Sequence, residues 1–229
     1  MTTSDTCATL VRDGDRDRYL STLYFPAAFR PAIFALHALD LELARVVATT
    51  TEPMIGEIRL AWWREALLKL DSGQVPAQPL LQAIAADVLP HGISGRSLET
   101  MEDAFHSLLI GKLKGEALET YVITRGGALF MAIGHVLKVG HHWPRELGAG
   151  WAVGELAREP SPGRVDTEAL HAFDFKPVIT GVPPVLRPLA ALAKLARRDR
   201  RRWLAGRLPE PRGSLGRQAA MLKMIVSGS

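Results

Sequence analysis

Apolar residues recur at intervals of three and four along most of the chain, which is the period of amphipathic α-helices. Sustained alternation of apolar and polar residues is absent, as is an Asn-Gly hairpin signal, so strands are not expected. The pattern predicts helices over 5–22, 31–49, 54–71, 78–89, 95–111, 114–139, 146–158, 166–173, 184–206 and 214–227. The predicted fold class is therefore all-α.

Proline and glycine clusters interrupt this pattern, but none is long enough to be a domain linker. The best candidate for a boundary is PVITGVPP at 177–184, which we interpret as a loop inside one domain. A chain of 229 residues can bury a substantial core. We therefore predict one helical domain over 18–229, with basic C-terminal helices, preceded by a flexible or partly helical segment over 1–17.

The stretch FALHALDLELARVVATT, residues 34–50, is apolar around almost its whole circumference, which is typical of a helix buried in a large helical protein. Within that apolar surface lie Asp40, Glu42 and Arg45, and the only other titratable side chain is His37. Charged groups in such a place indicate either an active-site helix or the remains of one.

The composition is that of a folded globular protein, with 47% apolar and 23% charged residues, which excludes an intrinsically disordered chain. One cysteine excludes a disulfide framework and a cysteine-based zinc site. No run of about 18 apolar residues predicts a membrane span. The first twenty residues contain four aspartates and lack the features of a signal peptide or a mitochondrial presequence. We therefore expect a cytoplasmic protein, either free or peripheral on the inner face of the membrane.

Charge is distributed unevenly around the net value of +4. Residues 187–217 contain ten lysines and arginines but only two acids, so the rest of the chain is net acidic. Such a segment can contact an anionic membrane surface, an acidic partner protein or nucleic acid, and we do not favour nucleic acid. The alternative is an ordinary solvated helix face.

Three segments together resemble the squalene/phytoene synthase family. They are RYLSTLYFPAAFRPAIFALHALD (18–40), GEIRLAWWREAL (56–67) and, more weakly, GWAVGELARE (150–159). The resemblance implies a single-domain isoprenoid-synthase-like helical bundle around a central cavity. It also implies a chemistry, because active members of that family join two isoprenoid diphosphates head to head with magnesium.

The catalytic motifs of that family do not carry over. Its first aspartate motif aligns with Ala44, Arg45 and Ala48, and none of these carries a carboxylate. The family's arginine before that motif falls at Leu41, and the glutamine of its later helix at Gly154. An arginine at a magnesium-ligand position repels the metal. We therefore predict no catalytic residue, no metal site and no cofactor.

The run DLELARV resembles a non-catalytic branch of the same family, which includes an assembly factor for respiratory complex I. The predicted function is accordingly a degenerate family member. It would bind an isoprenoid or another lipid, or assist the assembly of a respiratory or other membrane complex.

A second hypothesis is an active, magnesium-dependent prenyltransferase of the squalene/phytoene type, which would use the shifted acids Asp40, Glu42, Glu57 and Glu155. Glu155 and Glu159 are four residues apart and could form a metal-binding pair. Under either hypothesis five side chains are candidate cavity or diphosphate-binding residues, and all of them except the glutamate are expected to attract an anionic lipid or a prenyl diphosphate. They are Tyr19, Arg30, Glu57, Arg59 and Arg64.

Two smaller features have structural interpretations. His141 and His142 lack further metal ligands at a recognisable spacing, so we expect a surface role rather than a metal site. The glycines of Arg125-Gly126-Gly127 are predicted to allow close helix packing or to line the cavity.

Overall fold

The computed structural model describes residues 3–140, 142–158, 163–173, 175, 179 and 181–228, with only the backbone of Ser4. The longer helices are α1 (Thr3–Gly14), α3 (Arg30–Ala48), α4 (Pro53–Leu70), α6 (Gly95–Ile110), α9 (His142–Arg158), α11 (Arg187–Leu204) and α12 (Leu215–Ser227). The shorter helices are α2 (Arg16–Thr22), α5 (Pro79–Ala83), α7 (Glu116–Val122), α8 (Ala128–Val136) and α10 (Thr167–Ala172).

Two kinds of short helical turn complete the fold. The 3-10 turns are η1 (Ala27–Phe29), η3 (Leu89–His91) and η5 (Pro184–Leu186), and the π-turns are η2 (Ile84–Val88) and η4 (Ile123–Gly127). Extended pairing within the described residues is limited to one isolated bridge between Leu113 and Val165. The all-α prediction is confirmed.

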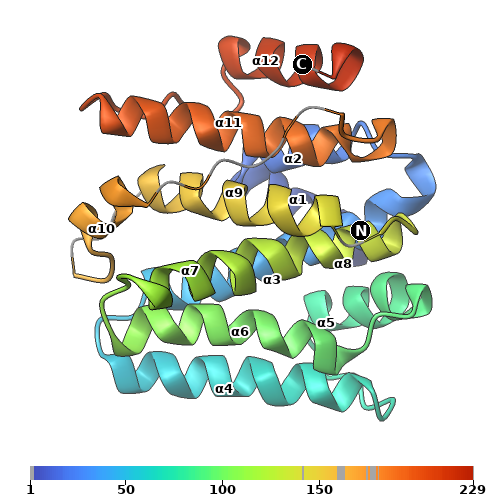
Figure 1. Ribbon diagram of the computed structural model, residues 1–229. Helices are drawn as coiled ribbons and strands as arrows, with labels where there is room; N and C mark the ends of the chain where they lie inside the picture. Colours follow the sequence, from blue (N-terminus) through green and yellow to red (C-terminus); the bar gives the residue numbers. More distant parts are fainter. Residues whose placement is uncertain are drawn as a thin grey trace.

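The long helices lie roughly side by side in a stack that runs from α4 through α6 and α9 to α11 and α12 (Figure 1). Helix α3 is at the centre of this stack, where it contacts α1, α2, α4, α5, α6 and α8. Its apolar circumference explains that place, because each side of the helix meets a different neighbour. The prediction that residues 34–50 form a buried helix is thus confirmed for α3.

The described part of the N-terminal segment, residues 3–17, belongs to this core. Helix α1 packs against α3 and α5, and Cys7 and Val11 are fully buried in the main hydrophobic cluster. The helix predicted over 5–22 is divided at Asp15, whose side chain caps α2 by accepting the amides of Asp17 and Arg18. The structure therefore places this segment inside the domain.

Small residues allow α9 to approach its neighbours closely. The backbones of Gly126 and Gly148 touch where η4 crosses α9, so that a Cβ atom on either one would overlap the other's carbonyl. Gly154 lies against Ala196 of α11 in a similar way. The packing role predicted for Gly126 is what the structure shows.

On α4 the adjacent tryptophans point apart. Trp63 is buried and Trp62 is about half exposed, and their rings meet edge to face. No helix in the described part of the chain is long and apolar enough to cross a membrane.

Candidate functional site

A pocket of about 840 Å³ opens beside the central helix α3. Side chains from α1, α2, α6, α7, η4 and α9 complete its wall, together with residues 164, 165 and 212. Its apolar lining consists of Leu10, Leu41, Ala44, Val47, Ala48, Phe105, Leu108, Leu156 and Val165. Its charged lining consists of Asp13, Arg18, Glu42, Arg45, Arg125, Glu155, Arg164 and Arg212. The pocket is thus a largely apolar space with an excess of arginines.

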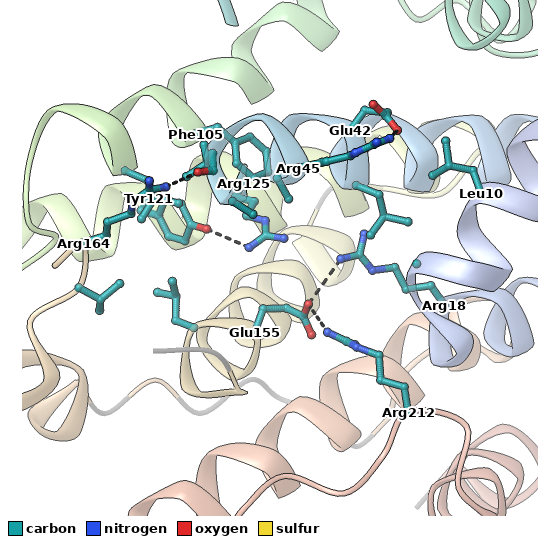
Figure 2. A pocket seen from close by; sticks show the side chains of 18 of the residues that line it. Leu10, Arg18, Glu42, Arg45, Phe105, Tyr121, Arg125, Glu155, Arg164 and Arg212 are labelled. Carbon is teal, nitrogen blue, oxygen red and sulfur yellow. Dashed lines mark hydrogen bonds and ion pairs between the residues drawn. The ribbon is translucent and has the colours of Figure 1, made fainter. Parts of the chain in front are cut away.

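The α3 wall contains the three positions that align with the family's first aspartate motif. Ala44, Arg45 and Ala48 all line the pocket, so these positions do face the cavity although none can bind a metal ion. Arg45 is mostly exposed, and its Nη1 lies 3.6 Å from Oε1 of Glu42 (Figure 2).

Asp40 is fully buried between two arginines that line the pocket, Arg18 and Arg125. Nη1 of Arg18 donates to its carboxylate at 2.7 Å, and Nε and Nη2 of Arg125 donate to it at 3.0 and 3.1 Å. Burial opposes ionisation, but the charges of Arg125 and Arg18 outweigh it and lower the pKa of Asp40 below its usual value. Asp40 is therefore a structural counter-charge for both arginines.

The π-turn η4 places Arg125 in this position. Its Nη1 donates to the hydroxyl oxygen of Tyr121 at 2.9 Å, and its guanidinium lies 5.2 Å from the ring centre of Trp151. Arg18 lies 4.5 Å from the same ring centre. Two cations thus share the faces of one tryptophan, which holds both in place.

Glu155 of α9 reaches the pocket but is also paired with arginine. Nη2 of Arg212 donates to it at 2.8 Å and Nη2 of Arg18 at 3.5 Å (Figure 2). Burial opposes ionisation of Glu155, yet the charges of Arg212 and Arg18 outweigh it and lower its pKa to about 2. The carboxylate is therefore ionised at neutral pH, and it is ion-paired with arginines of the protein.

Arg212, near the C-terminus, also links the pocket to the N-terminal part of the chain. Its Nη1 donates to Asp15 at 2.7 Å, and Nε of Arg18 donates to the same carboxylate at 2.8 Å. Arg217 of α12 continues the contact between the chain ends, with Nε donating to Asp17 at 2.8 Å and Nη1 to Asp199 at 2.6 Å.

These residues form two adjoining clusters of ion pairs, one around Arg18 and one around Arg217, which we call together the charge network, and it contains equal numbers of cations and anions. Its cations are Arg18, Arg125, Arg158, Arg212 and Arg217, and its anions are Asp15, Asp17, Asp40, Glu155 and Asp199. Every member except Arg212 has a side chain no more than 9% exposed. Ions buried to this degree are tolerated because each has partners of opposite sign.

The donor set of this pocket does not fit magnesium. The metal requires several free oxygen ligands in octahedral geometry, and no group of three or more potential ligands exists in the described part of the chain. The buried carboxylates Asp40 and Glu155 are bound by arginines, and Asp13 and Glu42 are each within ion-pair distance of an arginine.

Two of the five predicted cavity residues, Tyr19 and Arg30, lie near the start of the chain and outside the lining of this pocket. Tyr19 stacks on Phe34, and Nε of Arg30 donates to the carbonyl of Phe25 at 2.8 Å.

The other three, Glu57, Arg59 and Arg64, lie on α4, away from the pocket. Nη1 of Arg59 donates to the hydroxyl of Thr49 at 3.1 Å, and Nε of Arg64 donates to Glu102 at 2.8 Å. Helix α4 packs on α6, and Arg64 is directed to Glu102 of that helix. The structure thus places all five elsewhere than in this cavity, and ligand binding by them stays a prediction.

The pocket arginines 18, 125 and 212 were missed by sequence reasoning. The available signal was the opposite charge of the two chain ends, with Asp15 and Asp17 in one and a strongly basic segment in the other. From the sequence, the basic segment 187–217 is expected to be exposed, as a contact surface or a solvated helix face. The structure corrects this for Arg212 and Arg217, which are ion-paired in the interior.

The histidine pair lies outside the pocket. His142 is largely exposed at the start of α9, with Nδ1 3.7 Å from Glu146, as expected for a surface role. His141 and Glu159 lie outside the described residues.

His37 is an unusual member of α3. It is fully buried one turn before Asp40, and neither ring nitrogen has a hydrogen-bond partner within the described part of the protein. Burial, followed by the charge of Arg18, lowers its pKa to about 3. The imidazole is therefore neutral wherever the protein is folded near neutral pH.

Comparison with known proteins now identifies the family. A family model described as "Squalene/phytoene synthase" matches residues 11–139. The chain belongs to the squalene/phytoene synthase family. The match contains α3 and α4 and thus the degenerate aspartate positions.

Solved structures of this family share the fold. A dehydrosqualene synthase in complex with ligand superposes with a TM-score of 0.74 at 15% identity, over 98% of this chain and 95% of that one. The squalene synthase HpnC from Alicyclobacillus acidocaldarius gives a TM-score of 0.63 at 12% identity, over 99% and 94%. At these identities the likeness shows the fold alone.

Similarity in sequence is higher to a differently named group. NADH dehydrogenase (ubiquinone) complex I, assembly factor 6, of Mus musculus is 30% identical over 130 residues, which is 56% of this chain and 39% of that protein. The Homo sapiens protein is 32% identical over 97 residues, covering 42% and 29%. The matches thus span less than half the length of these relatives.

We predict that Arg217→Met lowers the free energy of unfolding by about 3–5 kcal/mol, because it leaves Asp17 and Asp199 buried without their shared cation. Arg207→Met removes an exposed arginine from the same segment and should change stability by less than about 0.5 kcal/mol. Urea unfolding followed by circular dichroism measures both. Equal midpoints for the two variants would contradict a structural role for the network.

His37 predicts a pH dependence of stability. The unfolded histidine has a pKa near 6.5, whereas the folded one stays neutral down to about 3, so only the unfolded chain gains a proton in this interval. Stability is therefore lost as pH falls. Between pH 7 and pH 5 we expect the wild type to lose about 2 kcal/mol more than His37→Leu. His106→Leu, on α6, is the control and should keep the wild-type loss because His37 is intact.

Proposed function

We propose that this protein is a non-catalytic member of the squalene/phytoene synthase family that assists the assembly of a membrane-bound respiratory complex. The observation that carries the proposal is the state of the pocket. Residues 44, 45 and 48 face it without a carboxylate, and Glu155 opposite them is bound by arginines. The named sequence relatives support the assembly role, since all those given above are complex I assembly factors.

The pocket itself is proposed to hold an isoprenoid or another lipid with an anionic head. Its volume and aliphatic lining suit a hydrocarbon chain, and the exposed guanidinium of Arg45 lies where an anionic group would meet it. Such binding needs no magnesium, because the cation comes from the protein. A protein of this kind would act at the face of the membrane that carries the complex.

The alternative, an active prenyltransferase with shifted acids, has less support in the geometry. Of its four candidate carboxylates, Asp40 is buried under two arginines and Glu57 lies outside the pocket. Glu155 is neutralised by Arg212 and Arg18, so Glu42 is the only one of the four that remains at the wall without buried arginine partners. The other lining carboxylate, Asp13, is ion-paired with Arg12. These two carboxylates are too few to hold the metal ions that neutralise a departing diphosphate, and the described residues contain no group of three potential ligands.

The loss of catalysis is tested by diphosphate release. With farnesyl or geranylgeranyl diphosphate and magnesium, we expect no release above that of a protein-free blank. Ala44→Asp/Arg45→Asp/Ala48→Asp is the matched variant, since it returns three carboxylates to the wall without touching the buried network. Release by the unmodified protein that is lost in Glu42→Gln would establish the alternative and overturn the proposal.

The assembly role is tested in cells of the source organism. We expect deletion of the gene to lower the amount of assembled NADH dehydrogenase complex on native gels, because a relative named for that assembly is 30% identical to 56% of this chain. A copy carrying Glu42→Gln/Glu57→Gln should restore the complex as fully as the wild-type copy, since neither carboxylate is needed for chemistry. An unchanged complex after deletion would rule out this role.

A further inference from the structure

The outermost layer of the stack consists of α11 and α12 (Figure 1). Helix α12 packs against α11 and α2, and it buries Arg217, Met221 and Met224 on that side. Arg187 fastens its C-terminal end by donating from Nη1 to the carbonyl of Val226 at 2.9 Å. One side of α12 is therefore fully engaged with the domain.

The opposite side of α12 is apolar as well. Leu215, Ala219, Leu222 and Val226 follow one another at spacings of four, three and four residues, which places them in one stripe along the helix. Leu215 is 84% exposed, Leu222 48% and Val226 70%. A helix that is apolar on two opposite sides is ordinarily covered on both. Here the outer stripe faces away from the rest of the domain.

A basic groove of about 400 Å³ runs beside this stripe, between α11 and α12. Its wall includes Lys194, Arg198, Arg201, Arg202 and Arg207. Lys223 directly follows Leu222 along the helix, and it lies near enough to Lys194 for its charge, after burial, to help lower the pKa of that lysine. Ala220 of α12 lines the groove directly, and around the helix Ala220, Lys223 and the stripe follow one another, so the groove lies along the flank of α12 that adjoins the stripe.

Acidic side chains are scarce on this face. Residues 187–228 contain only two, Asp199 and Glu210. Asp199 is buried against Arg217, and Glu210 accepts from Arg198 at 2.6 Å and from Arg202 at 3.3 Å. The exposed cations of the layer thus have no acid of the same layer left to neutralise them. These cations are Arg197, Arg201, Arg207 and Lys223.

We propose that this face of α11 and α12 is a contact surface for an anionic membrane. The stripe of α12 lies in the boundary between headgroups and acyl chains, and the groove binds lipid phosphates. Aliphatic side chains beside lysine and arginine are the pattern of helices that lie flat on such a surface. The inference stands independently of the assembly role, because it rests on residues that neither the pocket nor the buried network uses.

A lipid surface fits this face better than a protein partner does. The large apolar side chains exposed here are leucines and one valine, whereas protein interfaces are enriched in aromatic residues and methionine. The exposed apolar residues of α4 make a useful contrast, because Met54, Ile58 and Trp62 share their helix with the exposed acid Glu65. The exposed charges of α4 are therefore of both signs, since Arg59 and Lys69 accompany Glu65, whereas those of α11 and α12 are basic.

The test is flotation of the full chain with vesicles. We expect binding to phosphatidylcholine vesicles that contain phosphatidylglycerol, little binding to pure phosphatidylcholine, and release at high ionic strength. Arg201→Glu/Lys223→Glu should weaken binding at least about tenfold, because each basic residue near an anionic surface adds appreciably to the affinity. Leu215→Ser/Leu222→Ser should weaken it by a similar factor through the lost insertion of apolar area.

Matched controls are available elsewhere on the molecule. Arg96→Glu/Lys114→Glu reverses the same number of exposed charges, and Met54→Ser/Ile58→Ser removes exposed apolar side chains from α4. Both should bind as the wild type does, and circular dichroism verifies that every variant is folded. Equal binding to both vesicle types, no binding to either, or wild-type binding by both α11–α12 variants would overturn the proposal. A dimer that depends on Leu215 and Leu222, with no vesicle binding, would also overturn it and assign the stripe to a second copy of the chain.

Discussion

Buried ion pairing between the two ends of the chain is the interaction on which the rest of this structure depends. Asp15, just before α2, pairs with Arg212, and Asp17, in α2, pairs with Arg217 of α12. From Asp15 the contacts continue through Arg18 to Asp40 of the central helix α3. Each member is paired because an isolated buried charge would cost several kcal/mol. The network thus sets which helices can be neighbours around α9, and it explains why a strongly basic C-terminal segment is compatible with a compact domain.

The same network accounts for the chemical character of the pocket. A synthase that ionises a diphosphate needs carboxylates free to hold magnesium, whereas here guanidinium groups occupy the buried carboxylates Asp40 and Glu155. Arginine is always charged and hydrogen-bonds carboxylates in a fixed geometry, so it replaces the metal as a permanent counter-charge. The pocket therefore has a partly apolar lining, and its buried carboxylates Asp40 and Glu155 are bound by arginines rather than free to hold a metal ion.

The sequence predicted the fold more completely than it predicted the site. Helix periodicity located the long helices well, and the apolar circumference of residues 34–50 was enough to predict a buried α3. The aligned motif singled out Ala44, Arg45 and Ala48 as replaced aspartate positions, and the structure shows that these three residues line the pocket. The prediction that Arg59 and Arg64 face the cavity depended in addition on which side of α4 meets it. Periodicity describes the faces of a helix but not the neighbour that each face meets.

The sequence by itself determined the helices, the burial of α3 and the absence of the aspartate motif, because each depends on residues close together along the chain. It also determined that the chain ends carry opposite charge. Only the tertiary structure decided which charges are buried and which are exposed. Arg217 and Arg201 are both basic residues of one segment, yet the first pairs with two aspartates in the interior and the second lies on the surface. The difference arises from contacts between residues as much as 200 positions apart, which no local pattern specifies.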